Sequence, residues 1–217
     1  MITNHQLIAI REFAKSFHLI DATGHDWFHI SRVVNVAKQI ALAENVDVDK
    51  VEVVALLHDI ADYKMNNGDE NIGFEKITQF LTAIDFTQDQ ISEIITDIKN
   101  ISFKGGNNDN SKQSITSKVV QDADRIDAIG AIGIARTFAY GGSKKRMMYD
   151  PEIKPQLHQT AEEYKNSTAP TINHFYEKLL LLKDKMNTQT AQQIAEQRHL
   201  FLEQFLAQFF KEWEGKV

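Results

Sequence analysis

Residues 51–61 read Val51-Glu52-Val53-Val54-Ala55-Leu56-Leu57-His58-Asp59-Ile60-Ala61. The segment is long enough for a helix and almost continuously apolar, which predicts a helix buried on every side. His58 and Asp59 stand in its second half. A buried carboxylate without a partner is so unfavourable that it normally becomes neutral, pairs with a cation or binds a metal. Asp59 therefore needs compensation, and the imidazole beside it favours a metal ion.

Residues 119–135 show the same conflict between an apolar helix and its charges. The segment is rich in Val, Ile, Ala and Gly, which allows close helix packing, yet it carries Asp122, Asp124 and Asp127. At helical spacing Asp124 and Asp127 share a face, whereas Asp122 turns well away from it. The segment predicts a second buried helix whose acidic side chains need partners.

Two further imidazoles, His25 and His29, lie near the start of a third predicted helix. Thr23 or Asp26 is suited to cap this helix. His29 then lies one turn from Arg32 on the same face. Imidazole and carboxylate ligands from three helices, with no thiolate, suit Mn²⁺, Fe²⁺, Co²⁺, Ni²⁺, Zn²⁺ or Mg²⁺. Such a site leaves coordination positions for water and a substrate oxygen, as a catalytic centre requires.

The composition limits the classes of protein to which the chain can belong. Its 217 residues are 42% hydrophobic, enough for one sizeable core. It contains no run of about 18 apolar residues and no signal-peptide layout, so no membrane partner is predicted. The absence of cysteine excludes disulfides, thiolate zinc sites and cysteine nucleophiles, and a cytoplasmic location is expected.

The charge of the chain bears on its partners. A formal net charge of −6 argues against a nucleic-acid partner, because Lys and Arg supply most of the affinity for a phosphate backbone. A small phosphorylated substrate is compatible with this charge, since a metal or a local cation can offset it. A monomer and a homodimer are both compatible with the sequence.

Apolar spacing and capping signals predict an all-α fold, a single domain of about eight helices over residues 1–217. Strand patterning is nearly absent, and the few glycine-rich stretches are expected to be loops. Capping-box patterns begin at Thr3, Asp49, Thr87 and Thr190. The metal-site helices fall within about 25–138, and C-terminal helices over 162–213 complete the core. The helices are expected near residues 3–18, 26–44, 50–63, 71–84, 88–100, 115–138, 162–185 and 190–213.

Two simpler interpretations compete with a metal site. Asp59 could form a structural ion pair with Arg32 or Arg125, although the second acidic segment weakens that interpretation. The pair His25 and His29 resembles the H-E-x-x-H helix of zinc metalloproteases, with Asp in place of Glu. The glycine just before His25 places that residue in a capping turn instead, and a protease site leaves Asp59 unexplained.

Basic residues supply candidates for binding a phosphate. Lys64 follows the His58-Asp59 segment by about a turn and a half. Lys144 and Lys145 belong to a loop run that is either a solvated face or a phosphate clamp assisted by backbone N–H groups. His174 and Lys178 share a face of a predicted helix and form a weaker candidate pair.

Three motifs together resemble those of the HD-domain metal phosphohydrolases. Residues 26–33 look like the first-histidine helix of that family, residues 56–62 like its His-Asp doublet, and residues 122–127 like its late-aspartate helix. The resemblance implies an all-helical fold that binds one divalent metal ion. In the family the aspartate before the arginine is the ligand, which favours Asp124. The implied metal ligands are His29, His58, Asp59 and Asp124.

The resemblance extends to a bacterial subfamily of HD hydrolases. Residues 120–125, 130–136, 174–179 and 186–188 look like landmarks of this subfamily, and they cover most of the chain from residue 25 onward. Similar members are associated with hydrolysis of nucleoside triphosphates, including deoxynucleotides, and some release pyrophosphate. Hydroxyl residues at 116 and 117 stand where an acidic residue is expected, which leaves the implied metal ligands unchanged.

These implications yield a mechanistic hypothesis in which a metal-activated water attacks a phosphorus atom of a nucleotide. Asp59, Asp62 and Asp127 are the predicted catalytic carboxylates, with Asp62 or Asp127 orienting the water or acting as general base. The alternatives are a nucleoside monophosphate phosphatase, a cyclic-nucleotide phosphodiesterase and a nucleotide sensor with an inactive site. The predicted substrate contacts are His25, Arg32, Lys64, Arg136, Lys144, Lys145, His174 and Lys178.

Overall fold

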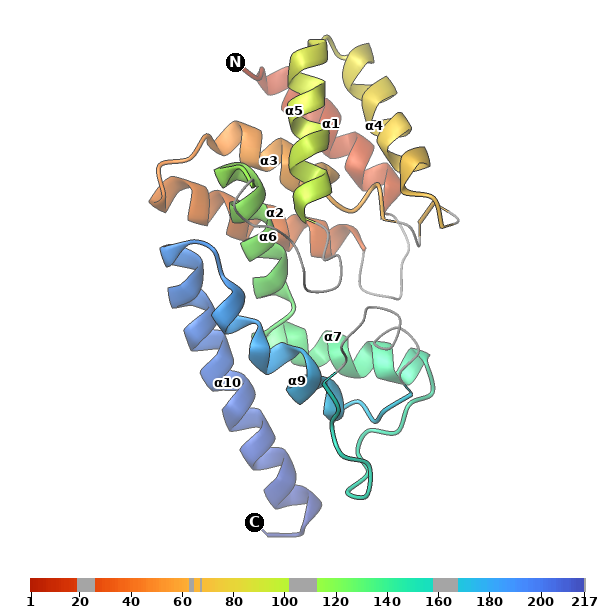
Figure 1. The fold of residues 1–217 in the computed structure, drawn as a ribbon, viewed down its shortest axis with the longest axis vertical. Helices are drawn as coiled ribbons and strands as arrows, with labels where there is room; N and C mark the ends of the chain where they lie inside the picture. Colours follow the sequence, from red (N-terminus) through yellow and green to blue (C-terminus); the bar gives the residue numbers. More distant parts are fainter. Residues whose placement is uncertain (19–25, 63–64, 67, 102–112, 158–167, 217) are drawn as a thin grey trace. The chain divides into compact units, whose positions relative to one another are not determined.

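The computed structural model describes residues 1–18, 26–62, 65–66, 68–101, 113–157 and 168–216. Every regular element within these ranges is helical, which confirms the predicted all-α class (Figure 1). Among the described residues, no helix is both long and apolar enough to cross a membrane. The chain divides into two compact units, one ending at Ala123 and one beginning at Asp124.

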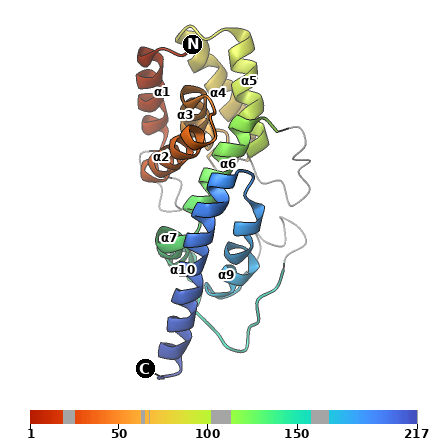
Figure 2. The same ribbon diagram turned by 90° about the vertical axis from the view of Figure 1, so that its left-hand side faces the viewer.

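The first unit is built around α3. This helix packs against α1, α2 and α5, and α4 packs against α5 (Figure 2). Each residue from Val51 to Leu57 is buried, as the apolar sequence predicted. The helices of this unit are α1 (Asn4–Phe17), α2 (Trp27–Ala43), α3 (Val48–Leu57), α4 (Glu70–Ala83), α5 (Gln88–Ile101) and the first part of α6 (Ile115–Asp127).

Capping side chains set where most of these helices begin. The predicted capping box of Thr3 and Gln6 is present on α1, and Thr87 exchanges the same pair of bonds with Gln90. The expected cap at Asp49 is wrong. Asp47 caps α3 instead, and its side chain accepts from the backbone N–H of Lys50.

The second unit packs α7 against α10. Between them, Phe138, Phe175 and Phe205 form an aromatic cluster in which the rings of Phe175 and Phe205 stack with centroids 5.6 Å apart. The cap of α10 is Thr188 and not the expected Thr190. The elements are the end of α6, α7 (Gly130–Ser143), α9 (Asn173–Glu177), the 3-10 turns η2 (Leu179–Leu181) and η3 (Lys183–Lys185), and α10 (Gln189–Trp213).

Two of the predicted long helices are interrupted. The helix expected over 115–138 breaks before Gly130, whose φ of +77° is accessible to glycine without strain. The side chain of Arg198 donates a hydrogen bond of 2.6 Å to the carbonyl of Ile126 and so satisfies the exposed end of α6. The helix expected over 162–185 is, in its described part, α9 followed by two 3-10 turns. There the backbone leaves helical angles at Lys178, with φ −143° and ψ −57°.

The close packing at the break between α6 and α7 can be tested by substitution of Gly133, with Gly142 on the same helix, α7, as the matched control. A Cβ on Gly133 would lie 2.2 Å from the carbonyl oxygen of Ala128, whereas a Cβ on Gly142 would meet nothing within 4 Å. We expect Gly133→Ala to lower the free energy of unfolding in urea by about 1–3 kcal/mol. Gly142→Ala should leave it unchanged or raise it by up to about 1 kcal/mol. Equal stability of the two variants would contradict the close packing at the break.

Candidate metal centre

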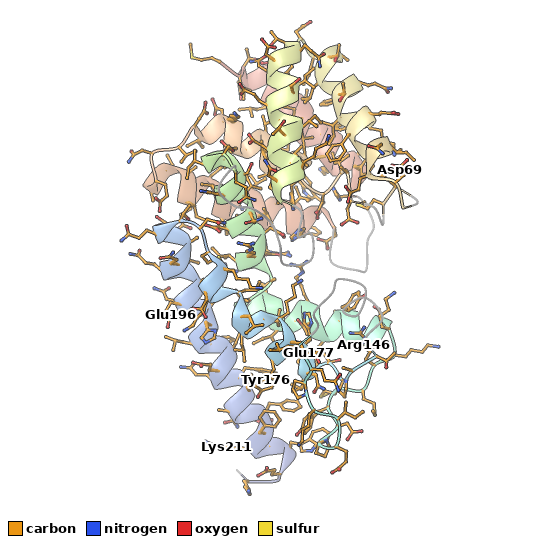
Figure 3. The ribbon with its side chains drawn as sticks, viewed as in Figure 1. Asp69, Arg146, Tyr176, Glu177, Glu196 and Lys211 are labelled. Carbon is orange, nitrogen blue, oxygen red and sulfur yellow. The ribbon has the colours of Figure 1, made fainter. Side chains whose placement is uncertain are left out.

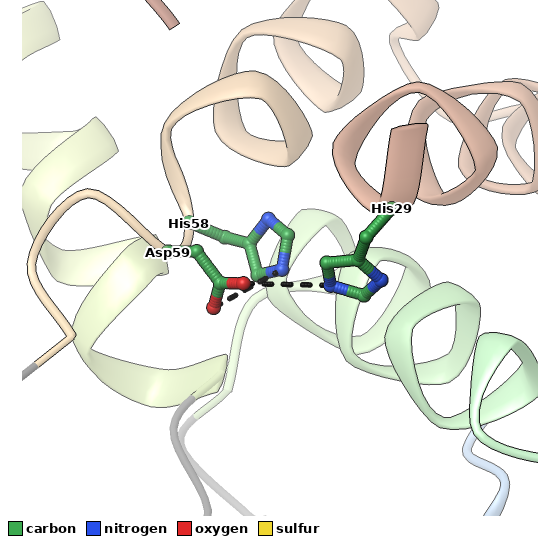
Figure 4. A group of neighbouring side chains, drawn as sticks. All are labelled: His29, His58 and Asp59. Carbon is green, nitrogen blue, oxygen red and sulfur yellow. Dashed lines mark ion pairs between the residues drawn. The ribbon is translucent and has the colours of Figure 1, made fainter. Parts of the chain in front are cut away.

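Three side chains of the first unit converge on one point. His29, His58 and Asp59 each offer a ligand atom, and these atoms all lie within 4.8 Å of one another. The Nε2 of His29 lies 3.4 Å from one carboxylate oxygen of Asp59, and the Nε2 of His58 lies 3.4 Å from the other (Figure 4). The two imidazole rings meet edge to face.

The start of α2 sets the position of His29. The carboxylate of Asp26 accepts a hydrogen bond of 2.8 Å from the backbone N–H of His29, so Asp26 is the cap and Thr23 is not needed. His29 therefore falls in the first turn of α2, where its side chain is buried. The cap at Asp26 thus fixes where the first turn of α2 begins and which residue of that turn is His29.

A backbone contact fixes the tautomer of His58. Its Nδ1 lies 2.8 Å from the carbonyl oxygen of Ala55, so Nδ1 carries the proton and Nε2 presents a lone pair. This Nε2 is buried and makes no hydrogen bond to any residue that the structure describes. An imidazole oriented in this way by a backbone carbonyl is the usual arrangement of a metal-binding histidine.

The turn after α3 carries Asp59. The predicted helix over 50–63 ends at Leu57. In the turn that follows, the side-chain amide of Asn66 donates to the carbonyls of Ile60, at 2.7 Å, and Asp62, at 2.9 Å. On α4, Gly73 lets the turn approach closely, since a Cβ there would lie 2.4 Å from the Cα of Ala61. The pattern of apolar residues did not predict this contribution from Asn66 and α4.

These donors fit a divalent cation. Two imidazole nitrogens and a carboxylate, with no thiolate, suit the first-row divalent metals and Mg²⁺. The buried, unbonded Nε2 of His58 is a polar atom that a metal ion would satisfy. Among the described residues these three side chains form a possible metal site.

The acidic residues of α6 differ in their surroundings. Asp122 is fully buried, in the first unit. Asp124, the predicted fourth ligand, is half-buried and begins the second unit, and its role stays a prediction. Asp127 is buried and accepts a hydrogen bond of 2.6 Å from Arg136, so two residues with predicted separate roles form an ion pair.

Comparison with known proteins assigns the family. The HD domain model matches residues 27–129. The uncharacterised Bacillus subtilis protein YpgQ is 37% identical over 207 residues, which cover 95% of this chain and 93% of that protein. The chain belongs to the HD-domain family.

Solved structures of similar proteins cover nearly all of the chain. A protein from Lactobacillus plantarum has 39% identity and a TM-score of 0.86, covering 99% of this chain and 100% of its own. An HD-superfamily hydrolase from Bacillus thuringiensis has 43% identity and a TM-score of 0.77, covering 97% of each chain. YpgQ in complex with ADP has 35% identity and a TM-score of 0.77, covering 98% of this chain and 100% of its own. The predicted class, an HD-superfamily hydrolase consistent with metal-dependent phosphohydrolysis, is confirmed.

The remaining predicted residues of this HD-domain protein lie in both units. Arg32 is half-buried on α2, and Asp62 is half-buried in the turn after α3. Lys144 and Lys145 are exposed beyond the end of α7. His25 and Lys64 lie outside the described residues, so their roles stay predictions.

His174 and Lys178 belong to a cationic cluster in the second unit. Burial, and then the charges of Lys178 and Arg146, lower the pKa of His174 to about 3. Backbone bonds from Thr171 to Met147 and from Ile172 to Met148 hold the loop after α7 beside the start of α9. Arg146, labelled in Figure 3, is half-buried, whereas Lys144 and Lys145 of the same basic run are exposed.

The metal centre makes a prediction about ion binding. We expect His58→Ala to weaken Mn²⁺ binding more than about 100-fold, because removal of a ligand exceeds the 10–100-fold effect of losing an outer partner. Isothermal titration of the folded protein with Mn²⁺ measures the change. His5→Ala, at an exposed histidine of α1, is the control and should bind as the wild type does. Unchanged affinity in His58→Ala would remove this histidine from the site.

The cationic cluster predicts a pH effect on stability. The pKa of His174 is about 3 in the folded chain and 6.5 in its ordinary state, so the unfolded chain binds the proton more readily between these values. The stability linked to neutral His174 is complete above pH 6.5 and is lost as the pH falls towards 3. Urea unfolding from pH 7 down to pH 4 should therefore show a smaller loss for His174→Gln than for the wild type. Identical pH dependence in the two proteins would contradict the lowered pKa.

Proposed function

We propose that this protein is a divalent-metal phosphohydrolase of nucleotides, which cleaves nucleoside and deoxynucleoside triphosphates and releases pyrophosphate. The observation that carries the proposal is the convergence of His29, His58 and Asp59 in a chain of the HD-domain family. The Bacillus subtilis relative YpgQ was solved with ADP, which supports a nucleotide as the ligand.

The proposed metal ligands are His29, His58 and Asp59, with Asp124 as the fourth. A divalent ion held there supplies Lewis acidity and an activated water, the two contributions that phosphoryl transfer to water requires. The carboxylate oxygens of Asp59 lie 3.4 Å from the Nε2 atoms of the two imidazoles, so its negative charge is placed where a cation would bind.

Two carboxylates were candidates for the general base. Asp127 already accepts a short hydrogen bond from Arg136, and we assign that pair to holding α6 and α7 together. We assign the base to Asp62, because its backbone N–H donates to the carbonyl of Asp59 and keeps it in the same turn as a metal ligand. A carboxylate held there can accept a proton from a water that attacks phosphorus.

The substrate phosphates require cations and hydrogen-bond donors. On α2, Arg32 lies one turn from His29 and offers a planar pair of donors to a phosphate. In the second unit, His174 and Lys178 stay proposed substrate contacts, and we add Arg146, whose charge acts on His174. Because the pKa of His174 is about 3, its ring at neutral pH donates one N–H and adds no charge.

A nucleotide panel with product identification tests the proposal. The purified protein with Mn²⁺ should convert nucleoside and deoxynucleoside triphosphates to monophosphates and pyrophosphate. Orthophosphate from monophosphates would instead indicate a phosphatase, and ring opening of a cyclic nucleotide a phosphodiesterase. Binding of nucleotides without any turnover would favour a sensor and overturn the proposal.

Substitution of Asp59 distinguishes a loss of the metal site from a loss of the fold. Asp59→Ala should abolish both metal content, measured by elemental analysis, and turnover, while the helical circular dichroism is retained. Asp184→Ala, at an exposed acid of η3, is the matched control and should keep both. Full hydrolysis by a metal-free Asp59→Ala protein would contradict the assigned role of Asp59.

A further inference from the structure

A buried acid lies two turns before the His-Asp doublet on α3. The side chain of Glu52 is only 2% exposed, and the residues that follow it in α3 are apolar and buried. One carboxylate oxygen pairs with Arg11 of α1 and the other with Lys38 of α2. Burial by itself would raise the pKa of Glu52, but hydrogen bonds and charges from Lys38 and Arg11 outweigh it and lower the pKa. Glu52 is thus a negative charge that joins three helices.

The bond to Lys38 fixes a second point along the pair of helices that holds the metal centre. His29 near the start of α2 meets Asp59 beyond the end of α3, whereas Lys38, further along α2, meets Glu52, further back on α3. The two helices are therefore antiparallel. At a rise of 1.5 Å per residue, His29 and Lys38 lie about 13.5 Å apart along α2.

Apolar packing alone specifies this register weakly. The buried faces of α2 and α3 consist largely of Val, Ala, Ile and Leu, and hydrophobic contact between such side chains has no preferred direction. A buried ion pair does have one, because sliding α2 along α3 would take Lys38 away from one buried carboxylate oxygen of Glu52. The Lys38–Glu52 ion pair and the His29–Asp59 contact therefore fix two points along this helix pair.

We propose that Glu52 is a positioning residue for the metal centre, acting through Lys38 to set the register of α2 against α3. In this way it sets the distance of His29 from His58 and Asp59. The inference rests on the proposed metal site. This positioning role can be distinguished from a general role in stability, because only one of the two cations that pair with Glu52, Lys38, belongs to a helix that carries a proposed metal ligand. Arg11 belongs to α1, which carries none of the proposed ligands.

This difference provides the matched pair of variants. Lys38→Met and Arg11→Met each remove one ion pair from the same carboxylate and keep most of the side-chain volume. We expect Lys38→Met and Glu52→Gln to weaken Mn²⁺ binding by about 10–100-fold, the range for partners that orient metal ligands. Arg11→Met should bind Mn²⁺ within about twofold of the wild type, although all three should unfold at a lower temperature without metal.

The proposal is tested by isothermal titration of each protein with Mn²⁺ at pH 7, which measures the affinity. Thermal unfolding of each metal-free protein measures its stability. Lys38→Arg restores the charge and should recover most of the affinity. If Glu52→Gln does not fold, Lys38→Met carries the test, because its side chain is 37% exposed and tolerates truncation. Wild-type affinity in Lys38→Met, or an equal loss in Arg11→Met, would overturn the proposal.

The same titration separates this inference from the proposed function. A wild-type protein that binds Mn²⁺ but hydrolyses no nucleotide overturns the proposed function alone, and the affinities of the variants still decide the role of Glu52. A wild-type protein that binds no Mn²⁺ overturns both.

Discussion

The burial of α3 from Val51 to Leu57 is the constraint on which the first unit depends. This part of the helix is surrounded by α1, α2 and α5, so a polar group on it needs a partner from another element. Glu52 has Arg11 and Lys38, and His58 and Asp59 converge with His29. The first arrangement neutralises a charge, whereas the second brings lone pairs together and so creates a place for a cation.

The turn that follows α3 makes the second arrangement possible. Had the helix continued to residue 63, the direction of Asp59 would have been set by helical geometry alone. Instead Asn66 captures two carbonyls of the turn, and Lys76 on α4 donates to the side chain of Asn66 at 3.2 Å. The metal centre therefore depends on α4, which supplies none of its ligands.

Local signals in the sequence predicted much of the fold. Thr3 and Thr87 were identified as caps because a hydroxyl and a glutamine three residues later satisfy each other's backbone groups. The same reasoning chose Asp49 and Thr190 wrongly, since Asp47 and Thr188 stand within two residues and compete for the same helix ends. The break before Gly130 was missed because the surrounding residues favour a helix. It is Arg198, distant in sequence, that bonds to the freed carbonyl of Ile126.

The sequence by itself determined the all-helical class, the burial of α3 and the need of its His-Asp pair for a partner. These follow from the period of the apolar residues and from the instability of a buried charge, which are properties of one segment. Only the tertiary structure decided that His29 meets this pair, that Asp127 binds Arg136 and that Glu52 joins three helices. Contacts between side chains on separate helices depend on register, and register is set when the helices pack.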